Sequence, residues 1–316
     1  MSYKILITGG AGYIGSTLIP LLLNQGYEVT VYDNMSYNTQ VLIPHFGNKN
    51  FYFIRGDILD KEKLKEAVKD KDIVIHLAAL VGFPLCDRKP DLAKKVNVGG
   101  TKNLIDVLSK NQLLFYSSTG SNYGNVSSEI DIVTENTPLN PTSLYGKTKT
   151  EAENLCMARE NSISYRFATV FGPSPRLRLD LLVNDLTYLA STQGYIVVYQ
   201  PEFIRSFIHA QDMVKSFLLG IQEHQKMIGN SYNIGSDNMS YSKRRVCEII
   251  SEKTKCLVYY ENFDYDRDHR DYEVSYEKIK KLGFNTTKTV EDGVEELVRV
   301  YKLLNLYDRN YYNIGE

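Results

Sequence analysis

Short apolar runs alternate with segments of helical periodicity through the first half of the chain. The runs are mostly continuous and rich in β-branched residues, which is typical of strands buried on both faces of a parallel sheet. Strands are expected over residues 4–8, 28–33, 51–56, 72–77, 113–118 and 163–168. Helices are expected up to about Gln25, over about 91–109 and over about 145–159. This alternation predicts an α/β fold with a doubly wound parallel sheet and helices on both faces.

The pattern becomes looser after Gly172. Strands are expected over 195–199 and 231–235, and helices near 181–192, 212–223, 242–251, 276–281 and 290–304. No repeat and no low-complexity linker separates the two halves. We therefore predict a nucleotide-binding domain over residues 1–170 and a smaller α/β substrate-binding part over residues 171–316, with a soft boundary that the chain is expected to cross.

Composition and charge narrow the class of protein. Hydrophobic residues make up 43% of the chain and charged residues 24%, as in soluble globular proteins. The 37 basic and 38 acidic residues give a net charge of −1, so neither nucleic acid nor a membrane surface is an expected partner. The densest apolar stretch, residues 14–23, is too short to span a bilayer. The four cysteines have no metal-ligand spacing, and with no signal sequence we expect a cytoplasmic protein without a metal site.

A glycine-rich loop follows the first expected strand. Gly9, Gly12 and Gly15 lie in the segment TGGAGYIG, between that strand and the next helical pattern. In this context the first glycine permits a tight turn, the second lets the backbone approach a pyrophosphate, and the third lets the helix pack closely on the strand. The helix N-terminus would then face the phosphates of a dinucleotide.

An acidic residue at the end of the second expected strand supports this interpretation. Asp33 follows Gly15 by 18 residues, and no arginine stands beside it in the sequence. A carboxylate there accepts hydrogen bonds from the adenosine ribose and repels a 2′-phosphate, so NAD is expected rather than NADP. Asp57, in RGDILD after the third strand, is a candidate contact for the adenine or else an ordinary turn aspartate.

Tyr145 and Lys149 lie four residues apart at the start of an expected helix, so their side chains share one face. An ammonium beside a phenol favours the phenolate, whose ordinary pKa is about 10. Such a phenolate could take a proton from a sugar hydroxyl while hydride moves to a nicotinamide. A tyrosine and a lysine at this spacing alone are more often part of a solvated helix face. Only in combination with the glycine loop does the pair indicate a catalytic site.

These motifs, together with the hydroxyl-rich strand end YSSTGSNYG, resemble the extended short-chain dehydrogenase/reductase family, specifically its NAD-dependent sugar-nucleotide epimerases and dehydratases. The likeness covers nearly the whole chain, including HLAAL at 76–80, VNVGGT around Asn97, RFATVFGP at 166–173 and RSFIHAQD at 205–212. It implies a Rossmann-type sheet, NAD as cofactor, a nucleotide-sugar substrate linked to GDP or UDP, and a homodimer.

The resemblance also implies site residues. Tyr145, Lys149 and Thr119 match the catalytic positions, with Ser118 as a competitor for Thr119, while His76 is expected to be structural. The implied cofactor contacts are Gly9, Gly12, Tyr13, Ile14, Gly15, Asp33, Asn34, Asp57, Ile58, Leu77, Ala78, Ala79, Asn97, Ser117, Tyr145 and Lys149. The implied substrate contacts are Val81, Thr119, Arg178, Asn184, Arg205 and Arg270, and the arginines suit a diphosphate because a guanidinium binds it in a bidentate way.

The two residues after Thr119 reduce the number of reactions of this family that the chain is expected to catalyse. The family's 4,6-dehydratases have Asp and Glu there, whereas this chain has Gly120 and Ser121, which cannot serve as the acid and base of an elimination. The expected reaction is oxidation of a sugar 4-hydroxyl, followed by release of the keto sugar or by return of hydride to give the epimer. Residues 80–90, 171–185 and 266–275 look like GDP-heptose 4-dehydrogenases of capsule synthesis, which favours the keto product. A non-catalytic NAD sensor is the alternative from another functional class.

Overall fold

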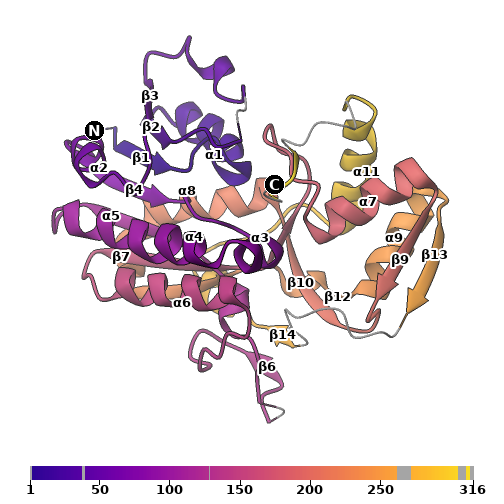
Figure 1. Cartoon of the computed structure of the whole chain (residues 1–316). Helices are drawn as coiled ribbons and strands as arrows, with labels where there is room; N and C mark the ends of the chain where they lie inside the picture. Colours follow the sequence, from indigo (N-terminus) through magenta and orange to yellow (C-terminus); the bar gives the residue numbers. More distant parts are fainter. Residues whose placement is uncertain (1, 38–39, 128, 262–271, 305–310, 314–316) are drawn as a thin grey trace.

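The central element is a seven-stranded sheet whose neighbouring strands all pair in parallel, in the order β11-β7-β5-β4-β1-β2-β3. The computed structural model describes residues 2–37, 40–127, 129–261, 272–304 and 311–313 (Figure 1). The strands of this main sheet are β1 (Lys4–Thr8), β2 (Glu28–Asp33), β3 (Phe51–Arg55), β4 (Ile73–His76), β5 (Leu113–Thr119), β7 (Ser162–Phe167) and β11 (Asn230–Ile234). The predicted doubly wound Rossmann-type sheet is therefore confirmed.

Helices cover both faces of the main sheet because its strands are apolar on both sides. On β1, Ile5 and Ile7 pack into one core with α1 (Tyr13–Asn24) and α8 (Ala210–Met227). Leu6, between them, packs into a second core on the opposite face. That face carries α2 (Lys61–Val68), α5 (Thr101–Val107) and α6 (Leu144–Met157), of which α5 and α6 lie side by side in Figure 1.

The helix expected over 91–109 is present, but it contains a π-helical turn. Its pieces are α4 (Pro90–Lys94), the turn Lys95–Gly100 and α5, and α3 (Phe83–Arg88) precedes them. The turn includes Asn97, which is 1% exposed. The Asn97 side chain accepts a hydrogen bond from the N–H of Leu80 and donates to its carbonyl and to the Thr148 hydroxyl. It thus holds the loop after β4 against α6.

A smaller part forms a second core. Its helices α7 (Leu182–Gln193), α9 (Lys243–Thr254) and α11 (Val290–Tyr301) pack against one another. Its strands are β8 (Thr169–Phe171), β10 (Ile204–His209) and β12 (Ser240–Ser242), which form one sheet, and β9 (Tyr195–Tyr199) paired with β13 (Leu257–Glu261). The remaining elements are β6 (Ile132–Val133) paired with β14 (Glu273–Val274), α10 (Glu277–Lys280), and short 3₁₀ turns at Ile43–His45, Gly120–Asn122 and Asp237–Met239.

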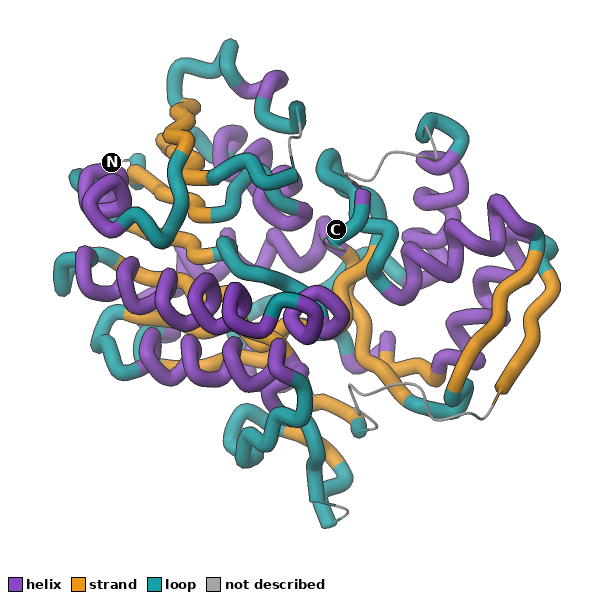
Figure 2. Tube along the Cα trace, in the orientation of Figure 1, coloured by secondary structure: helices purple, strands orange, loops and turns teal. Residues whose placement is uncertain are grey.

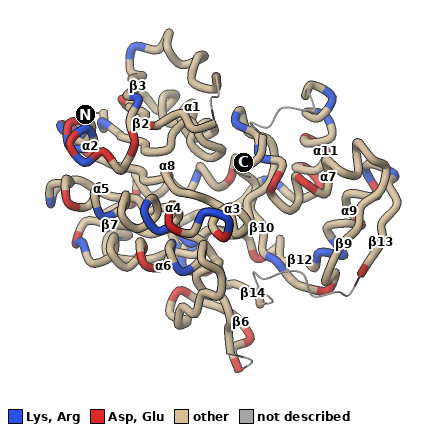
Figure 3. Tube along the Cα trace, in the orientation of Figure 1, with Lys and Arg blue, Asp and Glu red and all other residues tan. Residues whose placement is uncertain are grey.

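The chain passes between the two parts more than once. After β10 of the smaller part it enters α8 and then β11, which pairs with β7 at the edge of the main sheet. Residues beyond 170 therefore complete the main sheet, and the strand expected over 231–235 belongs there. Figure 2 shows loop segments gathered between the main sheet and α7, and Figure 3 shows basic and acidic residues interspersed over both parts.

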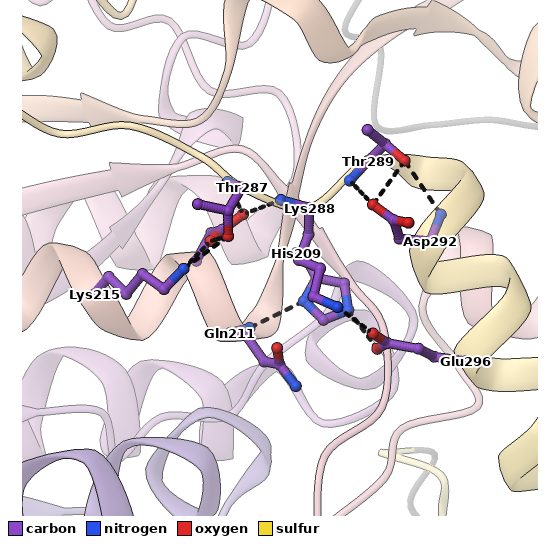
Figure 4. Close-up of polar contacts among 9 residues, drawn as sticks. His209, Gln211, Lys215, Thr287, Lys288, Thr289, Asp292 and Glu296 are labelled. Carbon is purple, nitrogen blue, oxygen red and sulfur yellow. Dashed lines mark hydrogen bonds and ion pairs between the residues drawn. The ribbon is translucent and has the colours of Figure 1, made fainter.

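A buried polar cluster joins α8 to the segment that leads into α11 (Figure 4). The carboxylate of Asp212, which is fully buried, accepts hydrogen bonds from the backbone N–H groups of Thr287 and Lys288 and from the Thr287 hydroxyl. Nearby, the Nε2 of His209 lies 3.2 Å from a carboxylate oxygen of Glu296 on α11. These contacts fix the C-terminal helix to the start of α8.

We expect Asp212→Asn to lower the free energy of unfolding by about 1–3 kcal/mol at pH 7, because the backbone N–H groups of Thr287 and Lys288 and the Lys215 ammonium lose a charged acceptor. Burial alone would raise the pKa of the Asp212 carboxyl, but hydrogen bonds from Lys215, Lys288 and Thr287 outweigh burial and lower it. A lowered folded-state pKa stabilises the fold above the ordinary value of about 3.9, and this stabilisation is lost as the pH falls through the folded-state value. Urea titrations at pH 7 and at acid pH should show the difference between wild type and variant shrinking in acid. A constant difference would contradict the assignment.

Candidate active site

The glycine loop brings two loops of the main sheet into close contact. Gly9 has φ of +70°, and a Cβ at this position would lie 2.7 Å from the Cα of Ala78, in the loop after β4. At Gly15, a Cβ would lie 2.4 Å from the carbonyl oxygen of Gly10. Gly12 is the N-cap of α1, and no side chain among the described residues caps this helix start. The first N–H groups of α1 therefore have the arrangement that binds a phosphate.

A cavity of about 840 Å³ opens at the carboxyl ends of the main-sheet strands, between them and the segment that joins β8 to α7. This is where open parallel sheets bind ligands. Most of the site residues predicted from the sequence line its wall. They are Gly9, Gly12, Tyr13, Ile14, Gly15, Asp33, Asn34, Asp57, Ile58, Leu77, Ala78, Ala79, Val81, Ser117, Thr119, Tyr145, Lys149 and Arg178.

Asp33 ends β2 at one end of this cavity. Its carboxylate accepts hydrogen bonds from the backbone N–H groups of Ala11, at 3.0 Å, and Met35, at 2.7 Å. Burial raises the pKa of Asp33, and the two backbone hydrogen bonds oppose this. Beside it, Asn34 donates to the Asp57 carboxylate at 3.0 Å. The structure thus ties the glycine loop to the two carboxylates that the sequence assigned to the adenosine.

Asp33→Ala is expected to weaken NAD binding by about 10-fold or more and to reduce the preference for NAD over NADP. The variant removes the acceptor for ribose hydroxyls and the charge that repels a 2′-phosphate. Asp33→Asn is the matched control, because it keeps one acceptor oxygen for the backbone. Titration of both variants with the two dinucleotides measures the preference, and an unchanged ratio in Asp33→Ala would remove Asp33 from the site.

Tyr145 and Lys149 lie on the first turns of α6. The hydroxyl of Ser143 caps this helix by accepting from the N–H of Gly146, which places Tyr145 in the first turn. Lys149, 4% exposed, lies one turn further, and its Nζ is 4.3 Å from the ring centroid of Tyr116. Burial lowers the pKa of the Lys149 ammonium to about 8. The helix thus presents a half-buried phenol and a buried amine to the same cavity.

The two candidate hydroxyls at the end of β5 have different partners. The Ser118 hydroxyl donates to Glu153 on α6 at 2.5 Å and accepts from the Asn122 side chain. The Thr119 hydroxyl accepts from the N–H of Ser121 at 3.2 Å and donates to the Ser121 hydroxyl at 3.3 Å. Because Ser118 donates over a short distance to a buried carboxylate, whereas Thr119 donates over a long distance to a neutral hydroxyl, Thr119 fits the role of donor to a sugar oxygen better.

Some predicted site residues lie away from the cavity wall. Asn97 is not among the lining residues, since its side chain is used within the fold. Asn184 is fully buried on α7, where it bonds to the backbone of Gly172 and to the carbonyl of Arg178. Its amide therefore positions the segment before α7 instead of facing the cavity, which corrects the expectation of a direct substrate contact.

The two remaining predicted arginines are separate from this wall. Arg205, 5% exposed, lines a small second pocket together with Gly120, Tyr272 and Thr169. That pocket shares Thr169 with the main cavity, so Arg205 lies next to it. Arg270 lies outside the described residues.

The structure adds residues that the sequence pattern did not single out. Glu153, 1% exposed, accepts hydrogen bonds from Ser118, Asn122, Arg166 and Ser231 behind the cavity. Its signal was a carboxylate one helical turn after Lys149, combined with the arginine of RFATVFGP.

His76, by contrast, has the predicted structural role. Its ring nitrogens bond to the hydroxyls of Thr8 and Thr101, at 2.7 and 3.0 Å. Burial, with a smaller contribution from Lys149, lowers the pKa of His76 to about 3. The ring is therefore neutral at physiological pH and serves to join β4 to β1 and α5.

Neither a bilayer-spanning helix nor a metal-binding group of three His, Cys, Asp or Glu residues is found in the part of the chain that the structure describes.

Comparisons with known proteins identify the family of the chain. The model of the NAD dependent epimerase/dehydratase family matches residues 5–235. A UDP-glucose 4-epimerase of Streptomyces lividans is 29% identical and aligns with 80% of this chain and 82% of its own length.

Solved structures with bound NAD share the fold over nearly the whole chain. UDP-glucuronic acid 4-epimerase from Bacillus cereus, in complex with UDP-glucuronic acid and NAD, is 25% identical with a TM-score of 0.84 and covers 95% of this chain and 99% of its own. The structure of dTDP-glucose 4,6-dehydratase from Bacillus anthracis, in complex with NAD, is 25% identical with a TM-score of 0.83. The match covers 98% of this chain and 99% of that one. The glycine cradle, the uncapped start of α1 and Asp33 fit this cofactor. The chain therefore belongs to the NAD-dependent epimerase/dehydratase family, and its cofactor is NAD.

Proposed function

We propose that this protein oxidises the 4-hydroxyl of a nucleotide-activated sugar with NAD, using Tyr145 as the base. The observation that carries the proposal is the placement of Tyr145, Lys149 and Thr119 on the wall of the cavity that the glycine loop also lines. A non-catalytic NAD sensor would not need a phenol, an amine and a hydroxyl together at this wall. The family relationship supports an enzyme of this kind.

The roles follow from the chemistry of the three side chains. NAD, when bound, supplies the hydride acceptor. Tyr145 as phenolate takes the proton of the sugar hydroxyl. The Lys149 ammonium, one turn from Tyr145 on α6, favours the phenolate over the neutral phenol through its positive charge. Thr119 holds the sugar oxygen through its hydroxyl, so that the proton and the hydride leave from a fixed geometry.

Elimination of water is disfavoured by the residues next to Thr119. Neither Gly120 nor Ser121 carries a carboxyl group, and the carbonyl of Gly120 accepts a hydrogen bond from the Tyr272 hydroxyl at 3.0 Å. Asp180, an acidic residue of the cavity wall, is engaged in an ion pair with Arg178 at 2.6 Å. We therefore propose a redox reaction at C4 without loss of the 6-hydroxyl, although dTDP-glucose 4,6-dehydratases are among the relatives.

Two fates of the oxidised sugar are proposed, in this order. Release of the 4-keto sugar rests on the sequence resemblance of residues 80–90, 171–185 and 266–275 to GDP-heptose 4-dehydrogenases alone, since the relatives reported above include no such enzyme and residues 266–271 lie outside the described residues. Return of the hydride to the other face, giving the 4-epimer, is favoured by the 29% identity to a UDP-glucose 4-epimerase. The relatives reported above concern UDP- and dTDP-sugars, so these belong in the test beside the GDP-linked heptose.

The deciding experiment incubates the purified protein with GDP-, UDP- and dTDP-sugars, with and without a 2-keto acid as hydride acceptor. Mass spectrometry and NMR identify the products. A product lighter by two hydrogens supports the keto sugar, and an isomer of equal mass supports epimerisation. Loss of water would overturn the argument from Gly120 and Ser121, and the absence of any product across the panel would count against a nucleotide-sugar substrate.

A further inference from the structure

Arg176 is a buried cation whose guanidinium has unsatisfied hydrogen-bond donors among the described residues. It follows β8, in the segment that leads to α7, and it lines the main cavity at only 2% exposure. Within the described residues, its Nε and Nη2 atoms are buried and make no hydrogen bond. Arg178, two residues later, is by contrast held in a bidentate pair by Asp180, at 3.1 and 2.6 Å. A buried guanidinium is retained in a fold only when something satisfies it, so the cavity should supply an anion.

The backbone around Arg176 is anchored to the first turns of α1. The N–H of Arg176 donates to the Ser16 hydroxyl at 3.2 Å, and the Ser174 hydroxyl donates to the carbonyl of Tyr13 at 2.6 Å. The Tyr13 hydroxyl in turn donates to the carbonyl of Gly172 at 2.7 Å. These bonds fix the segment 172–176 beside the helix start that has no side-chain cap.

The neighbours of Arg176 belong to the same cavity. Its guanidinium lies 3.9 Å from the ring centroid of Tyr37 and interacts electrostatically with Arg178, Asp180 and Asp33, all of which line that cavity. Arg178 interacts in turn with Tyr145. In a dinucleotide, the diphosphate joins the adenosine ribose to the nicotinamide ribose. A residue that lines this cavity and is bonded to the first turns of α1, whose N–H groups have the arrangement that binds a phosphate, is therefore placed to meet that diphosphate.

We propose that Arg176 is the counter-ion of the NAD diphosphate and binds it from the side opposite to the backbone N–H groups of α1. A planar guanidinium offers paired donors that match phosphate oxygens, and stacking on Tyr37 holds its plane. Burial and the neighbouring Arg178 lower the pKa of Arg176 to about 10, so the side chain is cationic at neutral pH. The proposal rests on the cofactor and not on the sugar reaction.

The test compares ligands that differ by the diphosphate. Nucleotide-free protein is titrated by calorimetry with ADP, adenosine, NAD and NADP, as wild type and as Arg176→Met, Arg176→Lys and Arg244→Met. We expect Arg176→Met to weaken ADP and NAD by about 10- to 100-fold while changing adenosine by less than about 3-fold. The affinities of Arg176→Lys for ADP and NAD should lie between those of wild type and Arg176→Met, since lysine keeps the charge but lacks the paired donors of the guanidinium. Arg244→Met should change ADP affinity little, because Arg244 lies on α9, pairs with Glu202 at 2.6 Å and is not among the residues that line the cavity.

Thermal unfolding separates binding from a structural role. Removing an unsatisfied charge should leave the Tm of ligand-free Arg176→Met equal to or above that of wild type, while the Tm increase on adding ADP shrinks. A markedly lower ligand-free Tm, unchanged ADP affinity, or equal weakening of adenosine would overturn the proposal. A loss of affinity for NADP alone would show that Arg176 binds the 2′-phosphate of the adenosine ribose instead. A raised KM for nucleotide sugar with unchanged ADP affinity would assign it to the substrate.

Discussion

Tyr145→Phe should lower kcat/KM by about 10²- to 10⁴-fold while NAD binding stays within about 3-fold of wild type. The variant keeps the ring at the cavity wall and removes only the oxygen that takes the sugar proton. Lys149 remains buried one turn away, so the site keeps its shape and its charge. Steady-state kinetics on the nucleotide sugar that the product analysis identifies, with calorimetric titration of NAD, measures both quantities.

The matched control for this prediction is Tyr195→Phe. Tyr195 lies on β9 of the smaller part, is 46% exposed and is not among the residues that line the cavity. Loss of its hydroxyl should leave turnover unchanged. If Tyr145→Phe turned over substrate as fast as this control, another group would have to be the base, and the proposed chemistry would fail.

The second large effect concerns stability. Glu153→Leu should lower the free energy of unfolding by about 3–5 kcal/mol, because it leaves Arg166 as an uncompensated buried charge. The Arg166–Glu153 pair is 2.8 Å long, and the two side chains are 8% and 2% exposed. Glu153 also accepts from hydroxyls on β5 and β11, so it joins α6 to three strands of the main sheet.

Urea titration at pH 7 measures this loss of stability. Two further variants test whether the loss comes from the unpaired charge of Arg166. Glu153→Gln keeps the shape and loses the charge, so its loss should be smaller than that of Glu153→Leu. The double variant Glu153→Leu with Arg166→Leu should be less destabilised than the sum of the single variants, since it leaves no orphaned charge. Strict additivity, or a loss below about 1 kcal/mol in Glu153→Leu, would show that the buried pair is not what holds these elements together.

The sequence predicted well what depends on neighbouring residues. The β1–α1–β2 unit follows from apolar periodicity and from glycines whose spacing matches the turn, and the structure has it within a few residues of the expected bounds. The shared face of Tyr145 and Lys149 follows from a spacing of four on one helix. Such features need only backbone geometry over one or two turns, which a local pattern contains.

Elements of the smaller part were harder to predict. The strands β8 and β10 of this part were not expected from the pattern, and β8 is only three residues long. The helix α2, which packs on the main sheet, was not expected either. Strand β10 takes its conformation from pairing with β8 and β12. Its residues pack into a core made by distant segments, so the local signal is weak.

By itself, then, the sequence determined the class of the fold, the glycine loop, the carboxylate at the end of β2 and the spacing of the phenol and the amine. The tertiary structure alone decided that β11 completes the main sheet, that Asn184 faces inward, that Glu153 meets Arg166, and that Arg176 lies buried beside the start of α1. Ser16 and Arg176 are 160 residues apart in the chain. Contacts of this kind depend on how separate segments pack and on which charges burial leaves without water, and no local pattern records either.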